Sequence, residues 1–326
     1  MSTKMADGGD EIFVYLGGEQ RVPYGTTHAI IDPSVKTVRR FAFVNRRRLV
    51  SVIFHDGVEI IEDEAFNECV RLNGVRLIGV REIGHKAFNG CEALTDVEFG
   101  DRLETVRSRA FDRCRLKSIK LPSARTVQEL SFSHCNQLTD VEFGINLERI
   151  GFNSFYNCRR LRRIAIPLKD DLFPFDSIIN RYNQFELCGN LTRVDIVGAE
   201  GIHKTISSIL LESWKDEMNE EIDRISRELP STSQHDKGDA VRQWIRSVID
   251  RMEHFKAEHN RLLNEHMTLL ELAVWKAKLD EKEEDSAQNV QAKRAKIDEE
   301  SIRKEKRITS GADIIIKNVL PFLKLA

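Results

Sequence analysis

The stretch IGHKAFNGCEALTDVEF, residues 83–99, decides the fold because its pattern recurs along most of the first two thirds of the chain. Its Phe is the marker of each copy, and the successive markers lie 23, 22, 23, 21, 23 and 30 residues apart. Self-similarity at about 22 residues is the signature of stacked structural repeats. The seven markers are Phe43, Phe66, Phe88, Phe111, Phe132, Phe155 and Phe185.

Each copy ends in Leu-x-x-Val/Ile-x-apolar, an alternation that predicts a short, half-buried β-strand. In the copy quoted above, Leu94, Val97 and Phe99 should point inward. A glycine or proline follows each strand, where we expect a sharp change of chain direction. One coil cannot bury its own Leu and Phe, so stacked coils should form a continuous core with a parallel sheet along one side.

This unit resembles the BspA-type leucine-rich repeats, which read approximately I-G-x-x-A-F-x-x-C-x-x-L-x-x-V-x-I-P. The resemblance covers roughly residues 29–198 and implies a solenoid. Three departures stand out: Arg46 replaces the first cysteine, one residue is missing between Cys114 and Leu116, and residues 168–183 are inserted before the last copy. We therefore do not predict regular repeat geometry for the C-terminal coils.

The cysteines invite a metal or disulfide interpretation, but each follows a marker Phe by three residues. Stacked coils would place them in a line, whereas zinc needs four ligands that converge tetrahedrally. No export signal precedes the repeats, which favours a reducing compartment and buried free thiols. We expect no metal and no other cofactor. The six residues are Cys69, Cys91, Cys114, Cys135, Cys158 and Cys188.

After Gly198 the apolar residues change to helical spacing. The pattern predicts one helix that ends near Pro230 and a second that begins near Asp239 and ends near Glu284. The wide apolar stripe of the second helix favours an αα-hairpin with the first, and self-association is the rival use. The final apolar segment, residues 311–326, is expected to dock on this stripe, with a role as anchor for a partner as the alternative.

The predicted fold class is α+β, a leucine-rich-repeat solenoid with a parallel β-sheet face followed by an all-α hairpin or coiled-coil-like region. Upstream of the repeats, residues 11–18 and 28–35 are strand candidates that would cap the open edge. The predicted domains are an N-terminal tail and cap strand (1–28), the seven-copy solenoid (29–199), the helical hairpin or coiled coil (200–284) and a charged linker with an apolar segment (285–326).

The outward positions of the strands form the predicted partner-binding face, because the sheet face of such repeats is the usual recognition surface. One outward column contains Ile53, Ala165 and Asp195 besides four residues that alternate in sign. Opposite charges on neighbouring strands also stabilise a sheet, which is the competing structural explanation. The candidate binding residues are Arg76, Asp96, Glu98, Lys120, Asp140, Glu142, Arg163 and Arg193.

The chain has 50 Lys and Arg against 52 Asp and Glu, so its overall charge does not favour nucleic acid or membrane as a partner. It contains no Walker loop, G-x-S-x-G elbow or kinase signature, and we predict no enzyme. The predicted function is a non-catalytic, intracellular scaffold or adaptor, placed in the cytoplasm, that binds an unidentified protein and self-associates or binds another through its helices. The alternative is a nuclear regulatory or nucleic-acid-associated protein that uses basic clusters at residues 39–48, 159–163 and 280–307.

Overall fold

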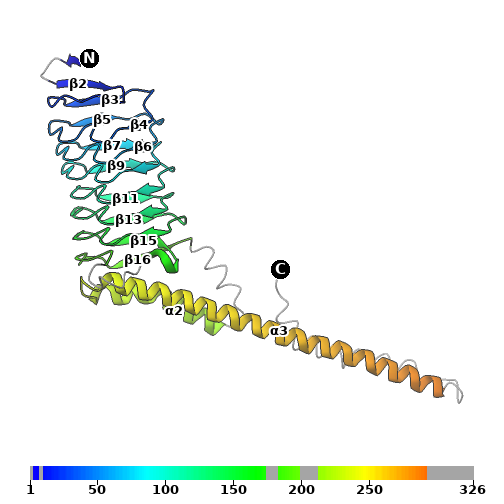
Figure 1. Cartoon of the computed structure of the whole chain (residues 1–326). Helices are drawn as coiled ribbons and strands as arrows, with labels where there is room; N and C mark the ends of the chain where they lie inside the picture. The colour runs from blue at the N-terminus through cyan, green and yellow to red at the C-terminus, as the bar shows by residue number, and fades with distance from the viewer. Residues whose placement is uncertain (1–2, 7–9, 174–182, 199–211, 292–326) are drawn as a thin grey trace. The chain divides into compact units, whose positions relative to one another are not determined.

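The computed structural model describes residues 3–6, 10–173, 183–198 and 212–291. The basic pieces near residues 293–307, the apolar segment 311–326 and the beginning of the first predicted helix lie outside these ranges. Predictions that fall on those segments therefore remain predictions. Within the described residues, the repeats stack as parallel strands, and a helical region follows them (Figure 1).

The described strands form three sheets. Two of them contain the strands predicted from the repeat pattern, and the third contains the two-residue strands on the other side of each coil. The first contains β1 (Thr3–Ala6), β2 (Asp10–Tyr15), β3 (His28–Ile31), β5 (Ser51–Ile53), β7 (Gly74–Leu77) and β9 (Asp96–Phe99). The second contains β11 (Ser118–Leu121), β13 (Asp140–Phe143), β15 (Arg163–Pro167) and β16 (Arg193–Val197). The third contains β4 (Thr37–Val38), β6 (Ile60–Ile61), β8 (Glu82–Ile83), β10 (Thr105–Val106), β12 (Thr126–Val127) and β14 (Arg149–Ile150).

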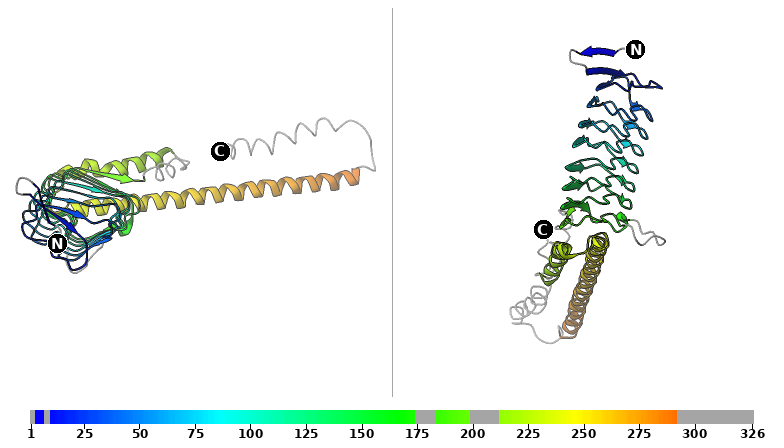
Figure 2. Two further views of the ribbon diagram at one scale, coloured as in Figure 1. Left: turned by 90° about the horizontal axis from the view of Figure 1, so that it is seen from above. Right: turned by 90° about the vertical axis from the view of Figure 1, so that its left-hand side faces the viewer.

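The marker phenylalanines form one continuous stack of rings through the core. Neighbouring ring centroids lie 4.7–5.8 Å apart with interplanar angles of 1–16°. All seven rings have 0% exposure, so each coil completes the core of its neighbours, as the repeat pattern predicts. Viewed from above, the coils overlie one another (Figure 2, left).

The turn around each marker Phe contains a backbone feature that the sequence did not predict. Around the first six markers the residues two before and two after the Phe adopt positive φ, as Glu64 (55°) and Glu68 (61°) do around Phe66, whereas around Phe185 only the following Leu187 does so. The amides of Glu64, Phe66 and Glu68 donate to carbonyls of the next coil at 2.7–2.8 Å. The positive φ of these residues thus directs alternate backbone amides along the stacking direction. The amides form a second ladder of hydrogen bonds between neighbouring coils.

The six cysteines are buried free thiols within this ladder, as predicted. Each thiol donates a hydrogen bond to the carbonyl of the marker Phe one coil earlier, at 3.0–3.3 Å. Burial raises the pKa of the Cys69 thiol to about 12, and it also raises the pKa of the Cys91 thiol. The cysteines therefore act as small internal donors within the stack.

The strand that follows the shortened copy does not pair with the strand before it. In the described chain, β9 ends the first sheet and β11 begins the second, with no strand pairing between them. The missing residue between Cys114 and Leu116 shortens the path into β11, which accounts for the lost register. Val97 and Phe99 on β9 are only half-buried, whereas most equivalent residues on other strands are buried. The third sheet continues past this break, because β10 pairs with both β8 and β12.

Two of the strand-end glycines have a different role from the one expected, whereas Gly198 has a positive φ of 77°, as expected. Gly100 and Gly144 do not have positive φ. A Cβ on Gly100 would lie 1.9 Å from the Ile78 carbonyl oxygen, and one on Gly144 would lie 1.7 Å from the Pro122 carbonyl oxygen. Close approach of neighbouring coils, rather than conformational freedom, therefore requires glycine at these turns.

The two upstream strand candidates are confirmed, since β2 pairs in parallel with β3 and β3 with β5. A further strand, β1, pairs antiparallel with β2, and the polar composition of the first residues gave no signal for it. Tyr15 extends the ring stack, 5.3 Å from Phe43. Arg46 is buried and donates through Nε to the Val22 carbonyl at 2.6 Å, in the position where later coils carry a thiol donor.

Two helices follow the repeats, α2 (Glu212–Glu228) and α3 (Lys237–Gln291), with a 3₁₀ turn at Leu229–Ser231 between them. They match the predicted pair, although α3 begins two residues earlier and ends seven residues later than expected. Two compact units divide the described residues: one contains the repeats up to Gly198 together with residues 217–250, and the other contains residues 212–216 and 251–291. The start of α3 thus belongs with the repeats, and the remainder of α3 belongs to the other unit.

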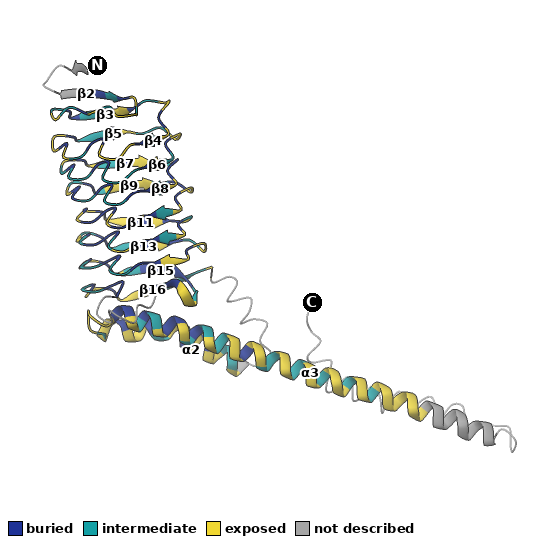
Figure 3. Ribbon diagram, in the orientation of Figure 1, coloured by how far each residue is buried: buried dark blue, intermediate teal, exposed yellow. Residues whose placement is uncertain are grey.

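The segment between the helices caps the last coil. Leu187 occupies a ladder position, and its amide donates to the Gln234 carbonyl at 3.2 Å, as if Gln234 belonged to another repeat. The ammonium of Lys237 is buried and donates to the Leu191 and Leu229 carbonyls. Trp244 has 1% exposure and donates through Nε1 to the Glu221 carbonyl at 3.0 Å. These contacts close the C-terminal edge of the array, and Figure 3 shows buried residues along the first part of α3.

Candidate protein-binding face

The face formed by β3, β5, β7 and β9 and by β11, β13, β15 and β16 presents two columns of outward side chains. Register places Arg76 opposite Glu98, and Lys120 opposite Glu142. These four side chains are exposed, whereas the residues that alternate with them point into the core. The second column pairs Asp140 with Arg163 and continues to Arg193.

Several candidate residues are held by ion pairs on the face itself. Arg76 Nε lies 2.6 Å from Glu98 Oε2, and this hydrogen bond raises the pKa of Arg76. Arg163 lies 2.5 Å from Asp195 and 3.9 Å from Glu142. Arg193 lies 2.7 Å from Asp195, whose hydrogen bond raises the pKa of Arg193. Stabilisation of the sheet by opposite charges therefore explains the charged residues at the two ends of the charged face.

The middle of the face contains charges that its own residues do not neutralise. Lys120 and Asp140 form no ion pair within the described residues, although Lys120 lies opposite Glu142. Asp96 accepts a hydrogen bond from the Thr95 hydroxyl at 2.7 Å and likewise has no cationic partner in the described ranges. These three side chains remain available for charged groups of a partner.

Two expectations for this face were wrong. Glu98 and Lys120 do not lie on paired strands, because the sheet breaks between β9 and β11. Ala165 has only 3% exposure despite its outward position. Its lateral neighbours are Glu142 and Asp195, and the guanidinium of Arg163 reaches both carboxylates, so longer side chains cover the methyl group.

The N-terminal end of the face is apolar. Register aligns Val14, Ile30 and Ile53 across β2, β3 and β5. Ile53 is 60% exposed and Ile30 is 37% exposed. Because these isoleucines lie in one row, they form a continuous apolar surface beside the charged strands.

A groove of about 700 Å³ extends the face beyond its last strand. Residues of β16, including Arg193 and Asp195, form one wall, and Ile222, Asp223 and Ser226 of α2 form another. The sequence could not reveal this groove, because it depends on how α2 packs against the last coil. Its lining combines apolar and charged groups, as protein-binding surfaces do.

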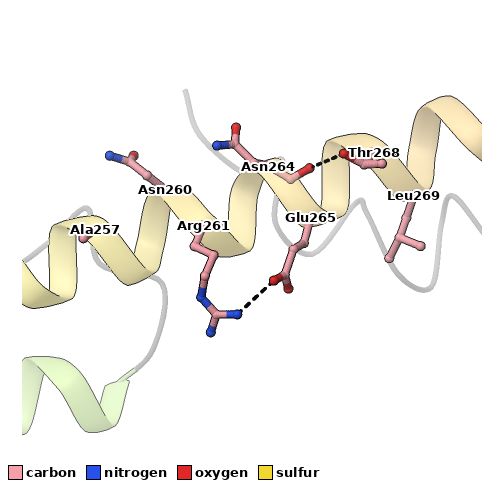
Figure 4. A pocket seen from close by; sticks show the side chains of 7 residues that line it. All are labelled: Ala257, Asn260, Arg261, Asn264, Glu265, Thr268 and Leu269. Carbon is pink, nitrogen blue, oxygen red and sulfur yellow. Dashed lines mark hydrogen bonds and ion pairs between the residues drawn. The ribbon is translucent and has the colours of Figure 1, made fainter.

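The outer part of α3 carries large apolar side chains that no described residue covers. Leu272 is 54% exposed and Trp275 62% exposed, and Leu279 continues their line at helical spacing. A shallow hollow nearby is lined by seven residues of α3 itself, where Arg261 pairs with Glu265 and Thr268 bonds the Asn264 carbonyl (Figure 4). The hollow lies on one helix and brings no catalytic group together.

The arginine clusters are largely engaged in contacts within the chain. Arg39 pairs with Glu62 at 3.0 Å, and Arg160 donates to the Gln137 side chain at 2.6 Å. In the described ranges, no three metal-binding side chains converge. No helix of the described chain is long and apolar enough to cross a membrane.

A second ladder of alternating charges lies along the third sheet, and it was not predicted from the sequence. Coil by coil, backbone hydrogen bonds link six residues whose charges alternate strictly along the stack. Arg125 lies 2.5 Å from Glu148, and Lys36 lies 3.7 Å from Glu59. The period of about 22 residues was the available signal for this ladder. Its members are Lys36, Glu59, Arg81, Glu104, Arg125 and Glu148.

Comparison with known proteins shows which family the repeats match. The family model described as the BspA type leucine rich repeat region matches residues 25–123 and 78–192 with six copies. A leucine-rich-repeat protein of T. pallidum is 25% identical, over 60% of this chain and 78% of its own, with a TM-score of 0.37. One from Bacteroides ovatus is 20% identical over 60% and 75%, with a TM-score of 0.36.

A leucine rich cell surface protein of Faecalibacterium prausnitzii is 17% identical, over 56% of this chain and 76% of its own, with a TM-score of 0.29. No curated protein matches the chain. All three TM-scores are below 0.5, so the family match alone carries the relationship.

Proposed function

Because the chain belongs to the BspA-type leucine-rich-repeat family, we propose that it is a non-catalytic adaptor that binds one protein on its repeat face and self-associates through its C-terminal helix. Leucine-rich repeats generally serve as protein-interaction or surface-binding modules. The periodic apolar residues build a scaffold, and the polar residues lie on its surface. This arrangement suits binding better than catalysis, which requires convergent polar groups in a pocket.

One observation carries the first part of the proposal: the face combines exposed isoleucines with central charges that have no internal partner. Ile30 and Ile53 offer apolar area, whose burial contributes about 25 cal/mol per Å². Lys120 and Asp140 can form ion pairs with a partner without breaking existing pairs of the described face. Solvation of charged side chains does not explain why exposed isoleucines lie on the same face as these charges.

Charge reversal at Lys120 and Asp140 tests the binding face. Native extract would be passed over the immobilised full chain and over a Lys120→Glu, Asp140→Lys variant, and bound proteins would be identified. The double substitution preserves net charge and breaks no ion pair of the described chain. Because the new charges lie opposite the like charges of Glu142 and Arg163, circular dichroism first establishes that the variant is folded. Loss of specific partners supports the proposal. The exposed residue Arg149 on β14 provides the control, since Arg149→Glu should retain those partners. An unchanged partner set in the face variant would contradict the proposal.

The second part of the proposal concerns the outer part of α3. A helix of 55 residues gains little stability in water without packing, and apolar residues at helical spacing are typical of interhelical seams. Leu272, Trp275 and Leu279 supply such a seam and are exposed. We infer that α3 of a second copy covers them.

Light scattering of the full chain should give twice the 37.5-kDa mass at micromolar concentration. Trp275→Lys should shift the mass toward one copy, because a buried seam does not tolerate an unpaired charge. Ala277→Lys adds the same charge at an exposed position on the opposite side of the helix and should leave the mass unchanged. A single-copy mass for the unmodified chain across the concentration range would refute self-association.

We also infer an intracellular, cytoplasmic setting, because six cysteines remain free thiols and disulfides are rare in reducing compartments. Imaging a tagged full chain tests this inference directly. An exclusively extracellular or nuclear signal would contradict it.

A further inference from the structure

A basic pocket of about 680 Å³ lies at the N-terminal end of the repeats, away from the candidate face residues. The loop that precedes β3 and the first marker turn form its walls. Four arginines, two exposed aromatic rings and two glutamates line it. These residues are Arg21, Arg39, Arg40, Arg46, Tyr24, Phe41, Glu19 and Glu62.

Arg46 is the fixed element of this pocket. It is 6% exposed, and its Nε and Nη1 donate to the Val22 and Val44 carbonyls. No carboxylate pairs with it within the described residues. A buried guanidinium whose charge meets only carbonyl dipoles favours a negative group nearby. The departure of Arg46 from the repeat pattern thus creates a positive centre at the end of the array.

Aromatic rings hold two of the guanidinium groups in place. The Arg46 guanidinium carbon lies 4.4 Å from the centroid of the Tyr24 ring, and that of Arg40 lies 4.6 Å from the centroid of the Phe41 ring. Tyr24 is 74% exposed and Phe41 42% exposed. Cation–π contact orients the guanidinium groups before binding, which reduces the entropy lost when a ligand binds. The exposed rings also leave apolar area for the ligand.

The acidic residues leave two arginines without carboxylate partners. Glu62 pairs with the Arg39 side chain and accepts a hydrogen bond from the Arg40 backbone amide. The guanidinium groups of Arg21 and Arg40 therefore have no acidic partner in the described part of the chain. Glu19 and Glu62 also line the pocket and repel closely spaced phosphates, whereas the carboxylates of a peptide can be spaced to avoid them.

We propose that this pocket binds an acidic peptide segment of a partner protein, one whose carboxylates flank an aromatic side chain. The carboxylates bind Arg21 and Arg40, for which bidentate geometry is favourable. The aromatic side chain packs beside the rings of Tyr24 and Phe41. This site shares no residue with the sheet-face site, so either can fail without the other.

Fluorescence anisotropy with a labelled peptide of sequence Glu-Glu-Phe-Glu-Glu tests the proposal on the full chain. We expect saturable binding, at least tenfold weaker for Arg21→Glu, Arg40→Glu. The matched control is Arg47→Glu, Arg48→Glu, which makes the same charge change in the same coil but outside the pocket. It should weaken binding less than twofold. Tyr24→Ala should weaken binding at least threefold without changing net charge. Circular dichroism establishes that each variant is folded.

Three outcomes would overturn the proposal. The peptide fails to bind saturably, or both arginine pairs weaken binding equally, which would indicate general charge attraction. Alternatively, inorganic phosphate displaces the peptide at concentrations no higher than a Glu-Glu-Phe-Glu-Glu competitor requires, which would indicate a simple anion site. A requirement for the phenylalanine, shown by weaker binding of Glu-Glu-Ala-Glu-Glu, supports the role given to the rings.

Discussion

Replacing Phe111 by alanine should lower the free energy of unfolding by about 4 kcal/mol. The ring has 0% exposure and stacks on Phe88 at 5.1 Å and on Phe132 at 5.4 Å. The Phe99 ring is nearly perpendicular to it, with its centroid 5.6 Å from that of Phe111. Truncation of a buried Phe costs roughly 3–5 kcal/mol, and the upper part of that range applies where neighbours cannot close the cavity. Here the backbone ladder fixes the coil on each side, because Phe88 and Phe132 both donate to the following coil.

Urea unfolding followed by circular dichroism measures this loss against the unmodified chain. Phe41→Ala is the matched control, since that ring is 42% exposed and its loss should cost less than about 1 kcal/mol. Domains are typically stable by only about 5–15 kcal/mol, so the difference between the two variants should be easily measured. A loss below about 2 kcal/mol for Phe111→Ala would refute the reasoning that the ring stack is the principal core of the array.

Three further predictions follow from close packing, thiol burial and the cap. Gly144→Ala should destabilise the fold by about 1–3 kcal/mol because its Cβ would meet the Pro122 carbonyl, whereas Gly189→Ala should stay within about 0.5 kcal/mol in the same urea assay. Stability should fall as pH rises from 9 towards 12: the raised pKa of Cys69 keeps the folded thiol neutral while the unfolded thiol ionises, and Cys69→Ser should reduce that slope. Trp244→Ala should cost about 3–5 kcal/mol and speed amide exchange in the last coil; unchanged exchange there would contradict the role of this residue in the cap.

The sequence predicted the features that recur in every copy. Spacing of the marker phenylalanines located the core, and the strand alternation gave the outward residues of most strands, including Arg76 and Glu142. It also identified the cysteines as part of the repeat. Such predictions succeed because the same steric environment is repeated, so each copy confirms the others.

Features that occur once were harder to predict. The break between β9 and β11 depends on one missing residue, whose effect on pairing cannot be read from composition. Arg46 stands out in the alignment as a departure, but its hydrogen bond to Val22 depends on how the upstream loop folds back. The contact between Leu187 and Gln234 joins segments with unrelated sequence patterns, and pattern analysis does not test such pairs.

The sequence predicted the outward position of most candidate residues of the face, but not which of their charges lack an ion-pair partner. The strand alternation predicts outward positions for both Glu98 and Lys120. Of the two, only Glu98 has an ion-pair partner in the described chain. Ala165 shows the same limitation, because the length of neighbouring side chains decides its exposure. Which charges are free for a partner depends on rotamers and on cross-strand distances, and the sequence contains neither.

The way the two ends are closed makes the length of this array adjustable. Arg46 connects the first full coil to the upstream loop, and Gln234 receives the amide of Leu187 from the last coil. Arg46 makes its closure from within the first coil, and Gln234 accepts from a ladder amide of the kind that the other coils also carry. An additional coil inserted between the ends would leave both closures intact and lengthen the exposed strand surface by one strand. Construction of this kind lets the strand surface grow in fixed increments, independently of the elements that close its two ends.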